Sequence, residues 1–142
     1  MNVGTAISLL VLIGFANAAR FHSGVVSQAC MQCICDQESG CRQSGCRMDV
    51  GSLSCGYFQI KQAYYTDCGS PGSDWKTCAD DLDCASRCVQ NYMRRYIGYS
   101  HCTSNCQSFA RIHNGGPHGC SRGSTVDYWN TMTRRQHCTS SS

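Results

Sequence analysis

The sequence predicts an α+β fold that is mostly helical, carries a small antiparallel hairpin or sheet, and is rich in disulfides. Three observations lead to this prediction. The chain has 14 cysteines in 142 residues. Apolar residues recur every three or four positions in several stretches, and one stretch is broken into short apolar pieces by glycines. The first spacing is typical of amphipathic helices, and the second of short strands joined by turns.

The first 18 residues are predicted to be a signal peptide. Residues 7–15 form a largely apolar run, and residues 16–18 follow with the small-x-small pattern that a signal peptidase cleaves. We expect cleavage after Ala18 or Ala19 and one domain over residues 19–142, because about 124 residues suffice for one core. The run is too short to span a bilayer. No membrane anchor is therefore expected, and the protein should be secreted and extracellular.

The cysteines predict a disulfide framework. Thiols oxidise outside the cell, and a small exported domain gains stability from cross-links. An even, dense set therefore predicts seven bridges, with the connectivity left open. A metal site is the alternative because Cys30, Cys33 and Cys35 have ligand-like spacing, but thiolate zinc sites belong mainly to reducing compartments. We expect no metal ion and no cofactor. The disulfide cysteines are predicted to be Cys30, Cys33, Cys35, Cys41, Cys46, Cys55, Cys68, Cys78, Cys84, Cys88, Cys102, Cys106, Cys120 and Cys138.

The first helix and the hairpin come early in the domain. Residues 27–37 lack Gly and Pro and have apolar residues at helical spacing, which predicts a helix. Gly40 would end this helix, so Glu38 would lie at its C-terminal end. Residues 46–60 contain short apolar pieces broken by glycines, which predicts a hairpin or a three-stranded sheet. Asp49 would lie on this sheet.

Two helices are expected in the second half of the chain. The longer one runs from Leu82 to Tyr96, where apolar residues every three or four positions form one buried stripe that includes Tyr92. The next covers residues 105–113 and is closed by Gly115-Gly116. Both would pack an apolar face against the core.

A last helix is expected over residues 125–135. Ser124 would open it, and Asp127 three residues later would complete an acidic capping box. No internal repeat or linker interrupts the predicted elements. The chain after the signal peptide is therefore one compact unit.

The net charge of +3 is carried by scattered basic residues. The pairs Arg94-Arg95 and Arg134-Arg135 do not form the basic stripe of a nucleic-acid-binding protein. A mild positive charge favours approach to anionic bacterial surfaces, but ordinary domains also carry it. We expect a monomer with no nucleic-acid partner. Four histidines have no metal-ligand spacing and are expected at the surface: His22, His101, His118 and His137.

Two carboxyl groups are candidates for acid–base chemistry. Glu38 is the only glutamate of the chain, and Cys35 and Cys41 bracket it. Cleavage of a glycosidic bond needs an acid for the leaving oxygen and a second carboxylate for the sugar centre, and Asp49 suits the second role. Bridges from Cys41 and Cys46, which lie between the two acids, would pin the helix end to the hairpin. The residues alone leave the partner open, because seven other aspartates compete: Asp36, Asp67, Asp74, Asp80, Asp81, Asp83 and Asp127.

Residues 30–41, 48–61 and 64–69 resemble the invertebrate-type lysozyme (destabilase) family. The resemblance continues through the segment with Cys84 and Cys88 and through residues 111–116, so it spans essentially the whole exported chain. It implies a lysozyme-like fold. It also implies a secreted lysozyme that hydrolyses the β-1,4 linkage between N-acetylmuramic acid and N-acetylglucosamine in bacterial peptidoglycan with retention of configuration. Chito-oligosaccharides would be weaker substrates, and either defence or digestion would be the biological role.

The resemblance also assigns roles to residues. Glu38 in Cys-x-x-Glu-Ser-Gly-Cys matches the proton donor, and Asp49 in Met-Asp-x-Gly-Ser matches the nucleophile. A carboxyl at a tight, partly apolar helix end should have a raised pKa, whereas one among polar groups should stay ionised, as in lysozymes generally. The implied substrate contacts are Lys61, Tyr64, Tyr65, Asp67, Tyr92, His113, Asn114 and Gly115. Two of these positions also have a structural interpretation, because Tyr92 could belong to the core and Gly115-Gly116 could be merely a helix stop.

Two other functions compete with this one. Some family members are associated with isopeptidase activity on ε-(γ-Glu)-Lys bonds, for which Ser54 with Lys61 would be the nucleophile and base here. A non-catalytic, cationic scaffold that binds or disrupts bacterial envelopes is the alternative from another class. Loss of Glu38 or Asp49 would indicate that scaffold. Both residues are present, which favours the enzyme.

Overall fold

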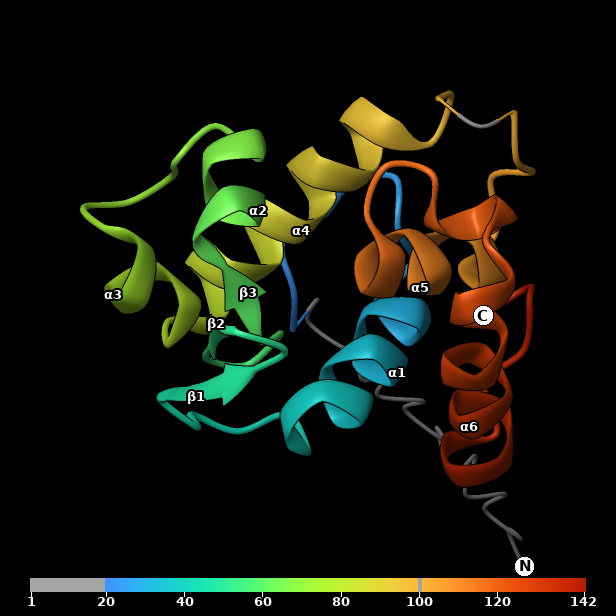
Figure 1. Cartoon of the computed structure of the whole chain (residues 1–142), viewed down its shortest axis with the longest axis horizontal. Coiled ribbons are helices and arrows are strands. Elements are labelled where there is room, and N and C mark those ends of the chain that lie inside the picture. The colour runs from blue at the N-terminus through green and yellow to red at the C-terminus, as the bar shows by residue number, and fades with distance from the viewer. Residues whose placement is uncertain (1–19, 100) are drawn as a thin grey trace, which may run out of the picture.

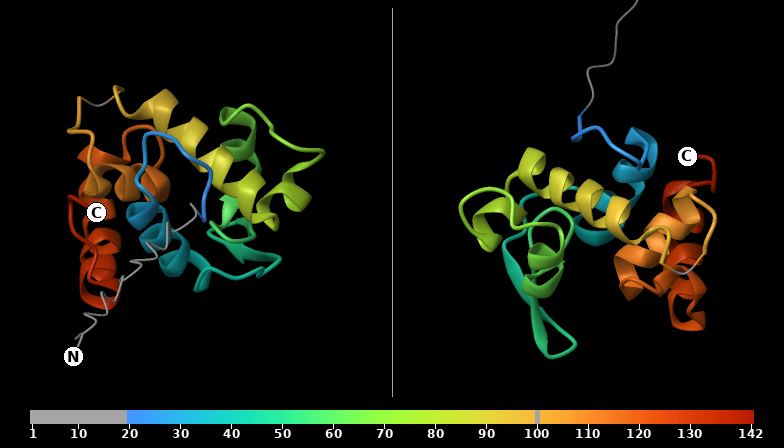
Figure 2. Two further views of the ribbon diagram at one scale, coloured as in Figure 1. Left: turned by 180° about the vertical axis from the view of Figure 1, so that it is seen from behind. Right: turned by 90° about the horizontal axis from the view of Figure 1, so that it is seen from above.

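The computed structural model describes residues 20–99 and 101–142, and the predicted signal peptide lies outside this range. The described chain has a sheet side, with three short strands and two short helices, and a helical side (Figure 1). One long helix, α4 (Leu82–Tyr96), crosses behind both sides, as Figure 2 shows from above. The predicted α+β, mostly helical class is confirmed.

Helix α1 (Gln28–Ser39) confirms the first predicted helix. The side chain of Ser27 caps its start by accepting a hydrogen bond from the backbone N–H of Cys30. Gly40 ends it in the left-handed conformation, with φ of 67°, and its N–H donates to the Asp36 carbonyl. Glu38 is therefore held at the C-terminal end of a well-capped helix.

The predicted three-stranded sheet is also confirmed. The strands are antiparallel in the order β1-β2-β3, and Asp49 is the last residue of β1, paired with Ser52. A two-residue turn of Val50 and Gly51, both with positive φ, joins the first two strands. Positive φ at both central positions gives the twist that a tight hairpin needs. The strands are β1 (Cys46–Asp49), β2 (Ser52–Cys55) and β3 (Ile60–Lys61).

The remaining helices follow the predictions with one correction. Helix α4 has the predicted bounds, and α5 (Cys106–Gly115) is capped by the side chain of Asn105. Helix α6 (Val126–Gln136) is present, but the capping box predicted at its start is wrong, because Thr125 precedes the helix without a side-chain cap bond. The hydroxyl of Thr125 donates instead to the Gly119 carbonyl. The shorter helices are α2 (Gln62–Asp67), α3 (Trp75–Ala79), η1 (Gly119–Ser121) and η2 (Gly123–Thr125).

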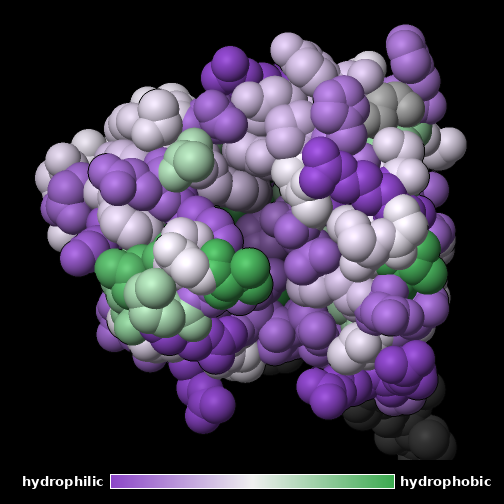
Figure 3. Space-filling view, in the orientation of Figure 1, coloured by the Kyte–Doolittle hydropathy of each residue, from purple (hydrophilic) through white to green (hydrophobic). Residues whose placement is uncertain are grey.

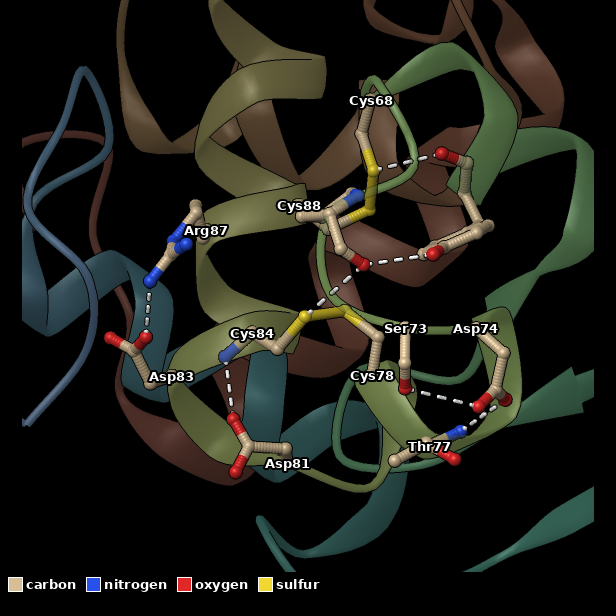
Figure 4. The surroundings of a disulfide bond; sticks show 12 residues. Cys68, Ser73, Asp74, Thr77, Cys78, Asp81, Asp83, Cys84, Arg87 and Cys88 are labelled. Carbon is tan, nitrogen blue, oxygen red and sulfur yellow. Dashed lines mark hydrogen bonds and ion pairs between the residues drawn. A yellow bond between two sulfur atoms is a disulfide. The ribbon is translucent and has the colours of Figure 1, made fainter.

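All 14 cysteines are paired, which confirms seven disulfides. Figure 4 shows the region in which two of them fasten the sheet side to α4, where Asp74 caps α3 and Asp81 caps α4. The bridges are Cys30–Cys106, Cys33–Cys138, Cys35–Cys41, Cys46–Cys55, Cys68–Cys88, Cys78–Cys84 and Cys102–Cys120.

The expected bridges between helix end and hairpin are wrong. Cys41 pairs with Cys35 and Cys46 pairs with Cys55, so each of these disulfides stays within its own region. Hydrogen bonds join the two regions instead. The Ser39 hydroxyl donates to the Tyr57 carbonyl at 2.7 Å, and the Arg47 guanidinium donates to the backbone carbonyl of Glu38 at 2.9 Å.

The core lies between α1, α4 and α5. Met31, Ile34, Met93 and Ile112 are fully buried there, together with Phe58 from the loop before β3. Within the described part of the chain, no helix is long and apolar enough to cross a membrane. The site described next is built on the solvent side of this core.

Candidate active site

A cleft of about 620 Å³ lies between the sheet side and the helical side. In Figure 3 it appears as a hollow with a mainly hydrophilic surface and an apolar flank on the sheet side. Residues of α1, β1, β2, α2, α4, α5 and α6 line it. Elements that are far apart in the sequence therefore meet at one concave surface, which is the usual setting of a ligand site.

Glu38 reaches this cleft from the last turn of α1. Its side chain is 18% exposed, and its Oε1 accepts a hydrogen bond from the Tyr128 hydroxyl at 2.7 Å. His113 Nε2 lies 3.5 Å from the same oxygen. Among the described residues Oε2 has no hydrogen-bond partner, yet it is not fully buried. The two oxygens of this carboxyl therefore differ in their hydrogen bonding.

The surroundings of Glu38 raise its pKa above the ordinary value. Burial is the largest cause, because a carboxylate loses hydration there, and nearby Asp49 adds to it. Three groups act in the opposite direction: His113, the hydrogen bond from Tyr128, and Arg47. The net result is a carboxyl that holds its proton to higher pH than an exposed glutamate, as a general acid must.

His113 lies beneath the acid and is nearly buried, with a side chain 3% exposed. Its Nε2 is 2.9 Å from the Phe58 carbonyl, which can only accept, so Nε2 carries a proton. Its Nδ1 is 3.0 Å from the Tyr64 hydroxyl and accepts from it in the neutral ring. The network therefore fixes the proton on Nε2, and the hydrogen bond between Nδ1 and the Tyr64 hydroxyl holds the ring in place. The ring of Tyr64 in turn stacks on Tyr92 with centroids 3.6 Å apart.

Asp49 reaches the cleft from the hairpin and is 53% exposed. Its Oδ2 lies 3.1 Å from the ammonium of Lys61 and accepts a 3.4 Å hydrogen bond from the Ser54 hydroxyl. Lys61 also donates to the Asp49 backbone carbonyl at 2.9 Å and to the Ser52 hydroxyl at 2.7 Å. Asp49 thus meets solvent, a cation and a hydroxyl donor on the hairpin side of the cleft.

Six of the eight predicted substrate contacts line the cleft: Lys61, Tyr64, Asp67, Tyr92, His113 and Asn114. Tyr65 and Gly115 do not. Tyr65 follows Tyr64 on α2, where successive side chains point in different directions, and its buried hydroxyl donates to the Pro71 carbonyl. A Cβ at Gly115 would meet the Thr125 side chain.

The predicted isopeptidase pair is not joined by a hydrogen bond. Ser54 and Lys61 face each other across β2 and β3. The Ser54 hydroxyl, however, donates to Asp49, and the Lys61 ammonium contacts Asp49 and Ser52. A nucleophilic serine needs a base within hydrogen-bond reach, and in the described structure Lys61 is not bonded to Ser54.

Two residues of the site were missed by the sequence analysis. Tyr128 lies on α6, ninety positions after Glu38, and Arg47 lies on β1. Neither occurs in a motif that points to a carboxyl partner, so only the tertiary contact identifies them. Among the described residues, no group of three His, Cys, Asp or Glu side chains could hold a metal ion.

The chain is similar to known proteins over most of its length. The destabilase family model matches residues 27–135. A lysozyme of Meretrix lusoria is 60% identical over 118 residues, which cover 83% of this chain and 97% of the relative. An invertebrate-type lysozyme of Ruditapes philippinarum is 56% identical over 119 residues, covering 83% and 88%. The crystal structure of Tapes japonica lysozyme matches with a TM-score of 0.81 and 55% identity, covering 84% of this chain and 98% of that one.

A raised-pKa carboxyl and an exposed, ion-paired carboxylate meet in one cleft of a helical, disulfide-rich fold. Together with the comparisons, this defines a glycoside hydrolase of the lysozyme class. Within that class, the chain belongs to the destabilase family of invertebrate-type lysozymes.

Proposed function

We propose that the protein is a secreted lysozyme that cleaves the β-1,4 linkage between N-acetylmuramic acid and N-acetylglucosamine in bacterial peptidoglycan. The observation that carries the proposal is the contrast between the two carboxyls in one cleft, Glu38 partly buried with a raised pKa and Asp49 exposed beside Lys61. Export rests on the predicted signal peptide and on the seven disulfides, which are typical of extracellular domains.

The first half of the reaction uses the two carboxyls in different roles. Glu38 gives its proton to the glycosidic oxygen, and the C1–O bond of the sugar breaks. Asp49 attacks C1 from the other face and forms a covalent glycosyl ester, while the leaving sugar departs as an alcohol. Because burial raises the pKa of Glu38, its carboxyl still carries the proton at a pH where an exposed glutamate would have lost it.

The second half reverses the role of Glu38. As a carboxylate it takes a proton from water, whose oxygen attacks C1 and releases Asp49. Two displacements at C1 return the original configuration. The polar and aromatic lining of the cleft suits the hydroxyls, amide arms and flat faces of sugar rings. We assign sugar contacts to Lys61, Tyr64, Asp67, Tyr92, His113 and Asn114.

The anomeric form of the first product tests this mechanism. We expect proton NMR of a chito-oligosaccharide digest to show the β-anomer first, followed by slow mutarotation. Retention requires the carboxyls to approach to about 5–5.5 Å, whereas an inverting pair is about 6.5–9.5 Å apart to leave room for a water. An initial α-anomer would remove Asp49 as the nucleophile and leave it at most a base.

The non-catalytic alternative is tested with the same preparation. The proposal predicts that loss of bacterial viability is accompanied by release of new reducing ends from peptidoglycan. Killing by the wild-type protein without any such release would favour a cationic envelope-binding protein instead.

A further inference from the structure

The C-terminal helix contributes a hydroxyl to the acid at the other end of the chain. Tyr128 lies in the first turn of α6, and its O–H donates to Oε1 of Glu38 at 2.7 Å. A phenol has one proton to donate, and no second acceptor for it is present among the described residues. Tyr128 is also the one hydrogen-bond donor to the Glu38 carboxyl in the described part of the chain.

This contact makes the two carboxyl oxygens of Glu38 different. Oε1 is occupied by Tyr128, whereas Oε2 has no hydrogen-bond partner among the described residues and is not fully buried, on a residue that lines the cleft. A proton placed on Oε1 would compete with the Tyr128 proton and leave a polar group unpaired, which is costly at a partly buried position. The proton of the neutral acid is therefore favoured on Oε2.

We propose that Tyr128 is a positioning residue of the glycosidase reaction, which selects Oε2 as the oxygen that carries the transferable proton and holds it toward the cleft. The inference rests on the proposed role of Glu38 as general acid. As the proton leaves Oε2, negative charge spreads to Oε1, and the hydrogen bond from Tyr128 becomes a stronger, charge-assisted one. Tyr128 thereby stabilises the carboxylate that the first step produces.

The other groups around the carboxyl do not supply this contact. His113 on α5 uses its Nε2 proton on the Phe58 carbonyl, and Tyr64 on α2 bonds to His113. Arg47 on β1 donates to the backbone carbonyl of Glu38 rather than to its carboxyl. Asp49 on β1 is a like charge that opposes ionisation of Glu38. Tyr128 is thus the direct hydrogen-bonding partner.

The position of Tyr128 is fixed by the way α6 packs on α1. Trp129 and Met132 bury the inner face of α6 in the core. Beyond the end of α6, the Cys33–Cys138 disulfide fastens the following chain to α1, and the Gln136 amide donates to the Gln37 side chain. The geometry of the acid therefore depends on a segment that the sequence places about one hundred residues away.

Direct titration of Glu38 tests the inference, because Glu38 is the only glutamate of the chain. Protein labelled with ¹³C at the glutamate side-chain carboxyl gives one glutamate carboxyl resonance, whose pH dependence reports the pKa of Glu38 without any activity assay. Tyr128→Phe should raise this pKa, since a hydrogen bond to the charged form is lost while burial is kept. Tyr65→Phe is the matched control, since it removes a buried tyrosine hydroxyl bond outside the cleft.

Kinetics with chito-oligosaccharide or peptidoglycan give the second measurement. Tyr128→Phe should lower kcat roughly ten-fold or more and leave KM within about two-fold, because a hydrogen bond to a charged group is lost in the transition state. The alkaline limb of its pH–rate profile should move to higher pH with the pKa of Glu38. Tyr65→Phe should keep the wild-type limb.

The outcomes separate this inference from the proposed function. An inactive wild-type protein overturns the proposed function itself, before any variant is made. An active wild-type protein whose Glu38 titration is the same in Tyr128→Phe, or is shifted equally in Tyr65→Phe, overturns only the role of Tyr128. If Tyr128→Phe is not secreted, 3-fluorotyrosine placed at position 128 keeps the ring and strengthens the donor. It should lower the pKa of Glu38, and no shift or a rise would also overturn the inference.

Discussion

The helix end with Glu38 and the hairpin with Asp49 place the same functional group in opposite surroundings. The Glu38 side chain is 18% exposed and contacts Tyr128 and His113, whereas the Asp49 side chain is 53% exposed and pairs with Lys61. Loss of hydration raises the pKa of Glu38 at the first position, whereas Asp49 at the second position keeps contact with solvent and an ammonium group. The difference shows that one cleft can give two carboxyl groups different surroundings, which is what the proposed division of roles between them requires.

The two regions also differ in their backbone. Gly40 takes the left-handed conformation after α1, which suits a residue without a Cβ. Val50 takes a similar conformation after Asp49, with φ of 45°, and this is unfavourable for a β-branched residue. At the helix end the left-handed residues are Gly40 and Cys41, with φ of 67° and 53°, and neither is β-branched. The hairpin turn therefore places its strained β-branched residue directly beside Asp49.

Removal of either carboxyl should have the largest effect. Glu38→Gln should lower kcat by ~10²–10⁴-fold, since proton transfer to the leaving oxygen is lost. Asp49→Asn should have a comparable effect, because an amide does not form the glycosyl ester. Release of reducing ends from peptidoglycan measures both. Asp127→Asn, exposed on α6 and outside the cleft, is the control. Substantial turnover in either amide variant would contradict the assigned roles.

Opening the local disulfide of each region should weaken both regions about equally. Two double variants remove these bridges, Cys35→Ala with Cys41→Ala and Cys46→Ala with Cys55→Ala. The bridges close short loops, with sequence separations of 6 and 9 residues respectively. Loop-closure entropy predicts a loss of about 2–3 kcal/mol in the free energy of unfolding for each pair. Guanidinium unfolding measures it. A difference well beyond 1 kcal/mol would mean that one region depends on its bridge for more than loop closure.

The free energy of unfolding should depend on pH because Glu38 is partly buried. The pKa of Glu38 is higher in the folded protein than in the unfolded chain. The contribution of Glu38 to the free energy of unfolding is therefore most favourable below the unfolded pKa, and it is lost as pH rises through the folded pKa. Glu38→Gln removes this loss, because glutamine does not ionise. The free energy of unfolding of this variant should match that of the wild type near pH 3 and exceed it by about 1 kcal/mol near pH 8. Thermal unfolding at both pH values tests this, with Asp127→Asn, exposed and outside the cleft, as the control. A pH-independent difference would contradict it.

Relief of the strained turn should have the smallest effect. Val50 is 98% exposed and loses little packing when replaced. Val50→Asn should raise the free energy of unfolding by about 0.5–1 kcal/mol, because Asn is favoured at the first position of this turn type. Thermal unfolding measures the change. Val25→Asn, at an exposed valine without positive φ, should give no gain. An equal response of the two variants would exclude backbone strain as the cause.

Much of the fold and part of the site could be predicted because their signals are local. The helical spacing in α1 and α4, the glycine after α1 and the short pieces of the sheet all act over a few residues. The short helices α2 and α3 were missed, because a five- or six-residue segment has too few positions to show a period. The capping box at Ser124 was wrong, because tertiary contacts wind residues 123–125 into a 3₁₀ turn.

The sequence by itself determined the number of disulfides, the α+β class and the two carboxyls, since cysteine count, spacing and the family motif are all written along the chain. Only the tertiary structure decided which cysteines pair, which predicted contacts face the cleft, and that Tyr128 meets Glu38. The physical reason is distance along the chain. Contacts between residues ninety positions apart depend on how buried faces pack, and packing is a property of the whole core rather than of any segment.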